Sequence, residues 1–238
     1  MKPVSVLVPP GSLVAGAAID LDDTELHHLR VRRVSLDREV TAMDGAGAVA
    51  TGALRNRGGI AVFMVDEIAT VAPQPVTVLA VGAGDRERVM QLAERATELG
   101  VSDVVPLDTE RSRTVETRWR DNLGERATRR AREACKQSGN PWAAVVHDLC
   151  TLEQLPSRFP ISRWLLADIS GTAAPQIAAQ EAVGWIVGPE GGLSDGELAW
   201  CRELLLVEPV RFTGPILRFD TAAIAAAVLT VDRRGSCP

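Results

Sequence analysis

The sequence has no long apolar segment. No apolar run approaches the ~18 residues that a membrane span needs, and the longest candidate, residues 222–230, is short and rich in alanine. The N-terminal stretch, residues 1–12, also lacks the long apolar core of a signal peptide. We therefore expect a cytoplasmic protein with no membrane partner.

Cysteine is too sparse to form a scaffold. The four cysteines are far apart, with no CxxC pair and no histidine at ligand spacing: Cys135, Cys150, Cys201 and Cys237. This pattern excludes a zinc ribbon and argues against a framework of disulfides. We expect no metal site.

Lysine is nearly absent, because only Lys2 and Lys136 occur among 26 basic residues. The net charge of −5 by itself argues against a nucleic-acid-binding protein. The arginines are clustered, however, and the first cluster contains Arg30, Arg32, Arg33 and Arg38. A second cluster spans residues 111–136, with acidic residues between its arginines. Arginine binds phosphate through two parallel hydrogen bonds, but a solvated helix face with internal ion pairs explains the second cluster equally well.

The 238 residues divide into two halves of different pattern. Residues 1–72 contain short β-type runs separated by Gly- and Asn-containing turns, at 5–8, 39–43, 49–54 and 60–68, with one helix at 23–32. Several strands in so short a segment indicate a small barrel or sandwich. A proline-bracketed stretch, residues 71–75, is typical of a linker.

Residues 73–238 alternate between apolar runs and helical patterns. We expect strands at 76–81, 101–107, 143–146, 164–167, 184–187 and 206–212, and helices at 85–99, 119–138, from 194 onward and at 221–231. This alternation predicts an α/β domain with a parallel sheet.

Residues 188–194 are the most informative segment. A buried strand leads directly into a glycine-rich turn and then a helix, whose start has Ser194 and Glu197 at the spacing of a capping box. Such a turn lies beyond the carboxyl end of a strand, where open α/β sheets bind ligands. A tight turn without a ligand is the alternative, but Glu190 has no packing role among glycines and indicates function.

Residues 214–223 form the second candidate segment. Arg218 and Asp220 stand at a junction between a loop and an alanine-rich helix. Asp220 or Thr221 could simply cap that helix, and Arg218 could form a surface ion pair with Asp220.

Other patterns are weaker. Residues 81–85 imitate the opening of a dinucleotide-binding fingerprint, but Glu87 occupies the third glycine position, so Asp85 more plausibly caps a helix. The three histidines form no catalytic triad with a serine and an aspartate. Among the tryptophans, Trp142 lies in a loop and could stack on a base.

Residues 188–194 and 217–222 together resemble the C-terminal signature of the RsmE-type 16S ribosomal RNA uridine-N3 methyltransferases of the SPOUT superfamily. Residues 94–101, 110–112 and 132–139 also fit that family, and residues 28–34 and 44–47 match its PUA-like domain. The resemblance extends over nearly the whole chain.

The resemblance implies a PUA-like RNA-binding β-barrel (residues 1–72) followed by a SPOUT α/β domain (residues 73–238) with a C-terminal trefoil knot, acting as a homodimer on 16S rRNA of the small ribosomal subunit. It implies that S-adenosylmethionine (SAM) is bound by Leu166, Ala167, Gly188, Glu190, Gly191, Gly192, Ile216, Leu217 and Arg218. Three departures concern basic residues that the family has near Ala83, Asn140 and Pro215, and Asp220 replaces a glutamate.

Methylation of uridine N3 requires removal of its proton, or a cation that stabilises the charge on the ring. We expect Arg218 to be that cation, with Asp220 or Glu190 as the base or as the group that orients Arg218. The RNA backbone is expected to contact Arg30, Arg32, Arg33, Arg111 and Arg113. The rival interpretations are a non-catalytic RNA-binding or ribosome-assembly factor, a methyltransferase of the same superfamily with another RNA target, and a nucleotide-dependent enzyme using residues 81–85.

Overall fold

The computed structural model describes residues 4–82, 85–112, 123–173, 175–203, 205–212 and 214–234. The chain divides into two compact units. The first comprises residues 1–73 and 132–143, and the second comprises residues 74–131 and 144–238. From the sequence we expected one division of the chain, at residue 72. The sequence did not indicate that residues 132–143 belong to the first unit.

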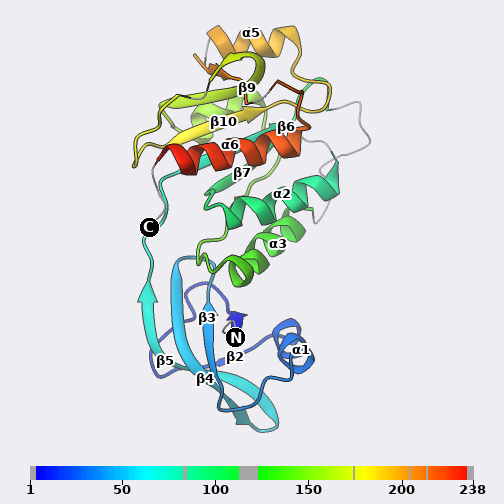
Figure 1. The fold of residues 1–238 in the computed structure, drawn as a ribbon. Helices are drawn as coiled ribbons and strands as arrows, with labels where there is room; N and C mark the ends of the chain where they lie inside the picture. Colours follow the sequence, from blue (N-terminus) through cyan, green and yellow to red (C-terminus); the bar gives the residue numbers. More distant parts are fainter. Residues whose placement is uncertain are drawn as a thin grey trace. The chain divides into compact units, whose positions relative to one another are not determined.

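The first unit is built on a five-stranded mixed sheet (Figure 1). Its elements are β1 (Ser5–Leu7), β2 (Ala18–Asp20), α1 (Asp23–Val31), β3 (Glu39–Met43), β4 (Ala48–Arg57) and β5 (Ile60–Thr70). The strand order is β1-β3-β4-β5-β2, with β1 parallel to β3 and the other pairs antiparallel. Four of these strands and α1 were predicted from the sequence, whereas the three-residue β2 was not.

Residues 132–143 complete the first unit. Lys136 is buried there and its Nζ lies 2.5 Å from Oε1 of Glu25 on α1. The ring of Trp142 covers Gly47 so closely that a Cβ at Gly47 would lie 2.3 Å from ring atom Cζ2. The Trp142 Nε1 also donates to the carbonyl oxygen of Val71 at 2.9 Å. One face and the polar edge of the Trp142 ring thus serve packing within the first unit, and stacking of this ring on a base stays a prediction.

The second unit contains a six-stranded, all-parallel sheet of order β11-β9-β10-β6-β7-β8. Its strands are β6 (Thr77–Gly82), β7 (Asp103–Leu107), β8 (Val145–Val146), β9 (Arg163–Thr172), β10 (Val183–Val187) and β11 (Glu208–Val210). Its helices are α2 (Arg86–Glu98), η1 (Leu152–Gln154), α4 (Leu155–Arg158), α5 (Asp195–Glu203) and α6 (Phe219–Arg233), together with the first part of α3 (Leu123–Ser138). The predicted alternation of strands and helices and the parallel sheet are confirmed.

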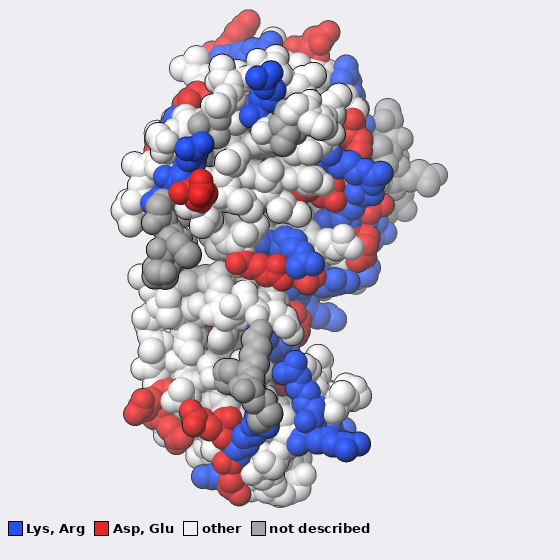
Figure 2. All heavy atoms as spheres, in the orientation of Figure 1, with Lys and Arg blue, Asp and Glu red and all other residues white. Residues whose placement is uncertain are grey.

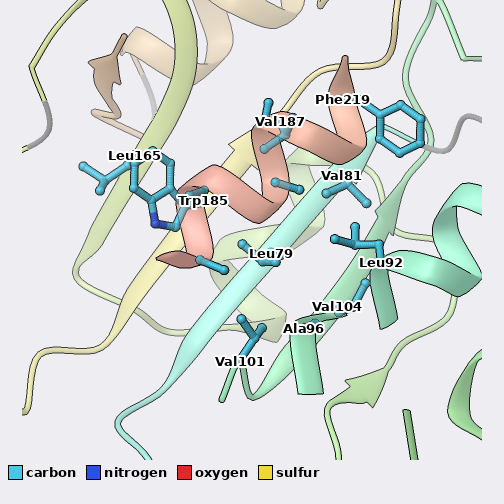
Figure 3. Close-up of a cluster of buried hydrophobic side chains, with 14 of the residues drawn as sticks. Leu79, Val81, Leu92, Ala96, Val101, Val104, Leu165, Trp185, Val187 and Phe219 are labelled. Atoms are coloured by element: carbon cyan, nitrogen blue, oxygen red, sulfur yellow. The ribbon is translucent and has the colours of Figure 1, made fainter. Parts of the chain in front are cut away.

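Every residue of β6 and of β10 is buried, because helices cover both faces of the sheet. Alternate side chains point to opposite faces. Leu79 and Val81 pack with α2 and α6, as Figure 3 shows, whereas Val78 and Ala80 pack with α4 and α5. The alanines of α6 allow this helix to pack closely against the sheet, and the Trp185 Nε1 on β10 donates to Thr230 Oγ1 on α6 at 2.8 Å.

Two of the helix starts that the sequence predicted are confirmed and one is wrong. Asp85 caps α2 by accepting from the Arg88 backbone N–H at 3.1 Å. Ser194 and Glu197 form the expected capping box at the start of α5. The capping residue of α6 is Arg218, whose side chain makes no capping bond, so neither Asp220 nor Thr221 caps this helix.

Three general expectations can be compared with the described part of the chain. None of its helices has both the length and the apolar character that a membrane crossing requires. Cys135, Cys150 and Cys201 are buried and form no disulfide with one another, and Cys237 lies outside the described residues. No group of three histidine, cysteine or acidic side chains within the described ranges is arranged to hold a metal ion.

Candidate functional site

A cavity of about 270 Å³ opens in the second unit, where β9, β10 and β11 lead into their loops. Its walls come from residues far apart in the sequence. They include the middle of β9, most of the segment 187–193, Val210 at the end of β11, residues 211, 212 and 215–217 of the following loop, and the first turn of α6. Parallel strands end at the same edge of a sheet, so loops that follow them converge there. The cavity is thus a product of the sheet topology.

The turn after β10 has a shape that favours glycine at two positions. Gly192 has φ +71°, a left-handed conformation that side chains disfavour. At Gly188, a Cβ would lie 3.1 Å from the backbone nitrogen of Leu193. The turn is closed by a hydrogen bond from the Gly192 N–H to the Pro189 carbonyl at 2.8 Å. Its backbone can therefore approach a ligand without side chains in between.

Most of the residues expected to bind the cofactor meet at this cavity. Those that line it are Leu166, Ala167, Gly188, Glu190, Gly192, Ile216 and Leu217. Gly191 and Arg218 do not line it. The sequence pattern had not indicated the contributions from Ile169, from residues 210–212 or from Phe219 and Ala222.

The walls are mainly apolar, and three charged residues stand among the lining residues. Leu166, Val187 and Leu193 are buried, whereas Ile216 is 81% exposed and stands at the mouth. Glu190 lines the cavity and is exposed, and Asp168 and Arg211 also line it. An apolar pocket with a few polar groups at its edge is the usual form of a small-molecule site.

Arg218 stands at the start of α6, next to the cavity residue Leu217. Its side chain is exposed and makes no hydrogen bond or ion pair within the described part of the chain. The alternative that it pairs with Asp220 is wrong. Its guanidinium is therefore available to a ligand or substrate.

Asp220 has a different partner from the one that its sequence neighbourhood indicated. Its Oδ2 accepts a hydrogen bond from Arg88 Nη1 on α2 at 3.2 Å. Its other oxygen, Oδ1, is buried and has no hydrogen-bond partner among the described residues. Asp220 does not line the cavity, so it can act on Arg218 through the helix start rather than on a ligand in the cavity.

A second set of contacts holds the glycine turn, residues 188–194, and comes from side chains that do not line the cavity. Arg111 Nη1 donates to the carbonyl oxygen of Gly191 at 2.5 Å. The carboxylate of Glu197 accepts from the backbone N–H of Ser194 at 2.7 Å and from that of Glu110 at 2.9 Å. Sequence reasoning found the capping role of Glu197 but gave no signal for its bond to residue 110.

The arginines expected to contact RNA have different surroundings. Arg30, Arg32 and Arg33 are exposed at the end of α1 in the first unit, and they have no ion pair with the described residues. Figure 2 shows basic side chains gathered over this helix. Arg113 lies outside the described residues.

Several side chains of the second arginine cluster already bond other residues of their own unit. Arg130 bonds Glu87 and Glu94 on α2, Arg132 donates to the Val8 carbonyl at 2.7 Å, and Lys136 is buried. Internal contacts therefore occupy these three side chains, although only Arg130 and Lys136 form ion pairs and the partners are not simply those of a solvated helix face.

The thiol near the site is unsuited to chemistry. Burial and, to a smaller extent, the nearby Glu197 carboxylate raise the pKa of the Cys201 thiol on α5 to about 12. Since the thiolate is the reactive form, Cys201 serves packing.

Comparison with known sequences gives consistent matches. The profile of a family described as RNA methyltransferase domain matches residues 72–231. The chain is 29% identical over 220 residues to the ribosomal RNA small subunit methyltransferase E of Aquifex aeolicus, covering 88% of this chain and 92% of that protein. It is 32% identical over 136 residues to the ribosomal RNA small subunit methyltransferase E 2 of Borreliella burgdorferi, and this match spans 55% of each protein.

Comparison with solved structures extends the likeness to both units. The ribosomal RNA small subunit methyltransferase E of Neisseria gonorrhoeae, solved with bound S-adenosyl methionine, superposes with a TM-score of 0.85 at 24% identity. The match covers 97% of this chain and 98% of that one. The likeness shows that the two chains share a fold.

Proposed function

This chain belongs to the RNA methyltransferase domain family, and we propose that it transfers a methyl group from SAM to N3 of a specific uridine in the 16S rRNA of the small ribosomal subunit. The observation that carries this proposal is the cavity, because it gathers seven of the residues that the resemblance assigns to SAM. The names of the two relatives and of the Neisseria gonorrhoeae structure support the ribosomal substrate and the cofactor.

The chemistry of the cavity suits SAM. About 270 Å³ is close to the lower end of the ~300–1,000 Å³ that small-molecule pockets occupy. The apolar walls at Leu166, Val187 and Leu193 suit a purine ring, and the bare backbone of the turn at Gly188 and Gly192 suits the polar atoms of the ligand. When bound, SAM supplies an electrophilic methyl group on its sulfonium, so no metal is needed for the transfer.

Arg218 is the residue that we assign to the substrate. Uridine N3 becomes nucleophilic as it loses its proton, and negative charge then spreads to the ring oxygens. An unpaired guanidinium at the cavity mouth can stabilise that charge. Arg218 meets this requirement because its side chain is exposed and has no partner among the described residues.

The two carboxylates are assigned different roles. Glu190 lines the cavity and is exposed, so it is our candidate for the base that accepts the N3 proton. Asp220 uses one oxygen for Arg88 and does not line the cavity. We assign it the task of positioning the start of α6, and with it Arg218.

RNA binding is assigned to the first unit. Arg30, Arg32 and Arg33 offer three exposed guanidinium groups at one end of α1, which suits contact with phosphates. Inside a duplex N3 is paired, so the target base must be unpaired or flipped out to be methylated.

The finer features of the fold follow the same resemblance. We propose that the mixed sheet of the first unit is a PUA-like barrel and that the C-terminal segment of the second unit forms a trefoil knot. The sheet order, with β9 between β11 and β10, and the closely packed α6 support the knot. A homodimer in the cytoplasm completes the proposal.

Two measurements test the function. Calorimetry of the purified protein with SAM should give saturable binding, and the absence of heat would favour a non-catalytic RNA-binding or assembly factor. Mass spectrometry of ribosomal RNA nucleosides should then show 3-methyluridine in cells that contain the protein and its loss in cells that lack it. Loss of another methylated nucleoside instead would indicate a different RNA target, which the missing family arginines near Asn140 and Pro215 make worth testing.

A further inference from the structure

Arg111 holds the glycine turn in place. Its Nη1 donates to the Gly191 carbonyl at 2.5 Å, and its side-chain stem lies against the same residue, since a Cβ at Gly191 would be 3.4 Å from Arg111 Cδ. Arg111 is not among the residues that line the cavity. It therefore touches the turn without occupying the space for a ligand.

Glu197 links Arg111 to the start of α5. One carboxylate oxygen accepts from the N–H of Ser194, where the turn passes into α5, and the other accepts from the N–H of Glu110, which precedes Arg111 in the chain. Because both oxygens are used, the 110–111 backbone and the α5 start are fixed to one another. The two side chains thus hold the turn at Gly191 and at its Ser194 end.

A turn of this kind needs such support. Glycine has more backbone freedom to lose than any other residue, so adjacent Gly191 and Gly192 would be mobile if left alone. Contacts that fix them before a ligand arrives lower the ordering cost of binding. A hydrogen bond from a charged donor is stronger than one between neutral groups, which makes a guanidinium suitable for this task.

We propose that Arg111 is a positioning residue for the glycine turn and that it does not contact RNA phosphates. Glu197 keeps the backbone at residues 110–111 in place relative to that turn. This assignment rests on the proposed function, since it takes SAM as the ligand of the turn. It replaces the RNA-binding role that the sequence had indicated for Arg111, and it leaves that role to the arginines of α1.

The test compares three variants with the wild-type protein. Arg111→Met keeps the apolar stem against Gly191 and removes the donor, Arg111→Lys restores one charged donor, and Glu197→Gln keeps the shape but loses one acceptor. We expect Arg111→Met to weaken SAM binding about tenfold in calorimetry without RNA, the loss of one charged hydrogen bond. Arg111→Lys should recover part of this loss, and Glu197→Gln should weaken SAM binding in the same direction.

Two further readouts separate positioning from a general structural role. Arg111→Met should raise KM for SAM and leave kcat at saturating SAM near the wild-type value, because the lost contact acts on binding alone. Its RNA affinity should keep the wild-type salt dependence. The matched control is Arg95→Ala, an exposed arginine on α2 that pairs only locally with Glu98, and it should leave all of these quantities unchanged.

The opposite results are equally distinct. An unchanged SAM affinity in Arg111→Met, with a salt slope for RNA that is smaller by about one, would overturn the proposal and return Arg111 to the RNA contacts. If the wild-type protein itself binds no SAM, it is the proposed function that fails. If the wild type binds SAM and all three variants bind it equally well, the positioning role alone is wrong.

Discussion

Arg88 on α2 donates a hydrogen bond to Asp220 on α6 across 3.2 Å, although the two residues are 132 positions apart in the sequence. Both side chains are partly buried, at 30% and 22% exposure. The pair joins two helices that pack together on one face of the parallel sheet. It also holds the first turn of α6, which directly follows Arg218, so a change on α2 can reach the start of this helix.

The first prediction concerns this pair. Arg88→Ala and Asp220→Asn should each lower the free energy of unfolding by about 1 kcal/mol, because the pair is only partly shielded from water. Methyl transfer should fall further than this loss explains, since Arg218 loses its fixed position. Urea unfolding and steady-state kinetics of both variants and of the double variant measure the two effects. Additive losses in the double variant would show that the pair is not coupled.

Arg218→Ala separates binding from transfer. Because Arg218 does not line the cavity, the variant should bind SAM within about twofold of the wild type. Its kcat should fall by about 10²–10³, the usual cost of removing a group that stabilises developing charge. Calorimetry and a methyl-transfer assay check both statements, with Arg95→Ala as the control. Wild-type turnover in Arg218→Ala would remove this residue from the mechanism.

The arginines of α1 provide a prediction on RNA binding. Reversing the charge at Arg32 and Arg33 should weaken RNA binding and reduce the slope of log K against log salt by about one for each lost phosphate contact. Arg55→Glu is the matched control, because Arg55 is exposed in the same unit but pairs with Asp37. A slope that stays at the wild-type value in the double reversal would assign Arg32 and Arg33 to a structural role.

The buried pair between Lys136 and Glu25 should be costly to break. The two side chains are 6% and 2% exposed, so Lys136→Met leaves a carboxylate in a poorly solvated place. We expect a loss of about 3–5 kcal/mol in the free energy of unfolding, measured by urea denaturation. Adding Glu25→Gln should recover a large part of it. Glu133 also contacts Lys136 but is 41% exposed, and Glu133→Gln should have a much smaller effect.

The buried thiols give a prediction on pH. Burial raises the pKa of Cys135 from 9.0 to about 11 and that of Cys201 from 9.0 to about 12. A raised thiol pKa means that the folded state keeps a proton that the unfolded state releases, so stability is lost as the pH rises above about 9. Native protein should react with thiol reagents at pH 8 far more slowly than protein unfolded in urea. Equal rates would contradict the burial of these side chains.

The sequence predicted those parts of the fold that depend on local chemistry. Strand β3 has the predicted bounds, and the caps at Asp85 and Ser194 follow from side chains that bond backbone groups three residues away. The glycine turn was found for the same reason. In each case the interacting groups lie close together in the chain, so the pattern of residue types contains the information.

Long-range pairing was not predictable in this way. Nothing near Asp220 indicates Arg88, and nothing near Gly191 indicates Arg111, because these contacts exist only after the sheet has brought the helices and loops together. A surface pair of Arg218 with Asp220 was one alternative because they are neighbours in sequence, yet the helix start directs the two side chains to different surroundings. The three-residue β2 was missed because so short a strand has no repeating pattern.

The discontinuous make-up of the first unit limits how the chain can be dissected. A fragment that ends at residue 73 would lack Lys136 and Trp142, leaving Glu25 without its cation and Gly47 without its cover. Such a fragment would expose apolar surface and aggregate instead of folding as an isolated module. To transfer the first unit to another protein, both residues 1–73 and residues 132–143 would have to be moved. Recombination that exchanges only the N-terminal segment is therefore disfavoured.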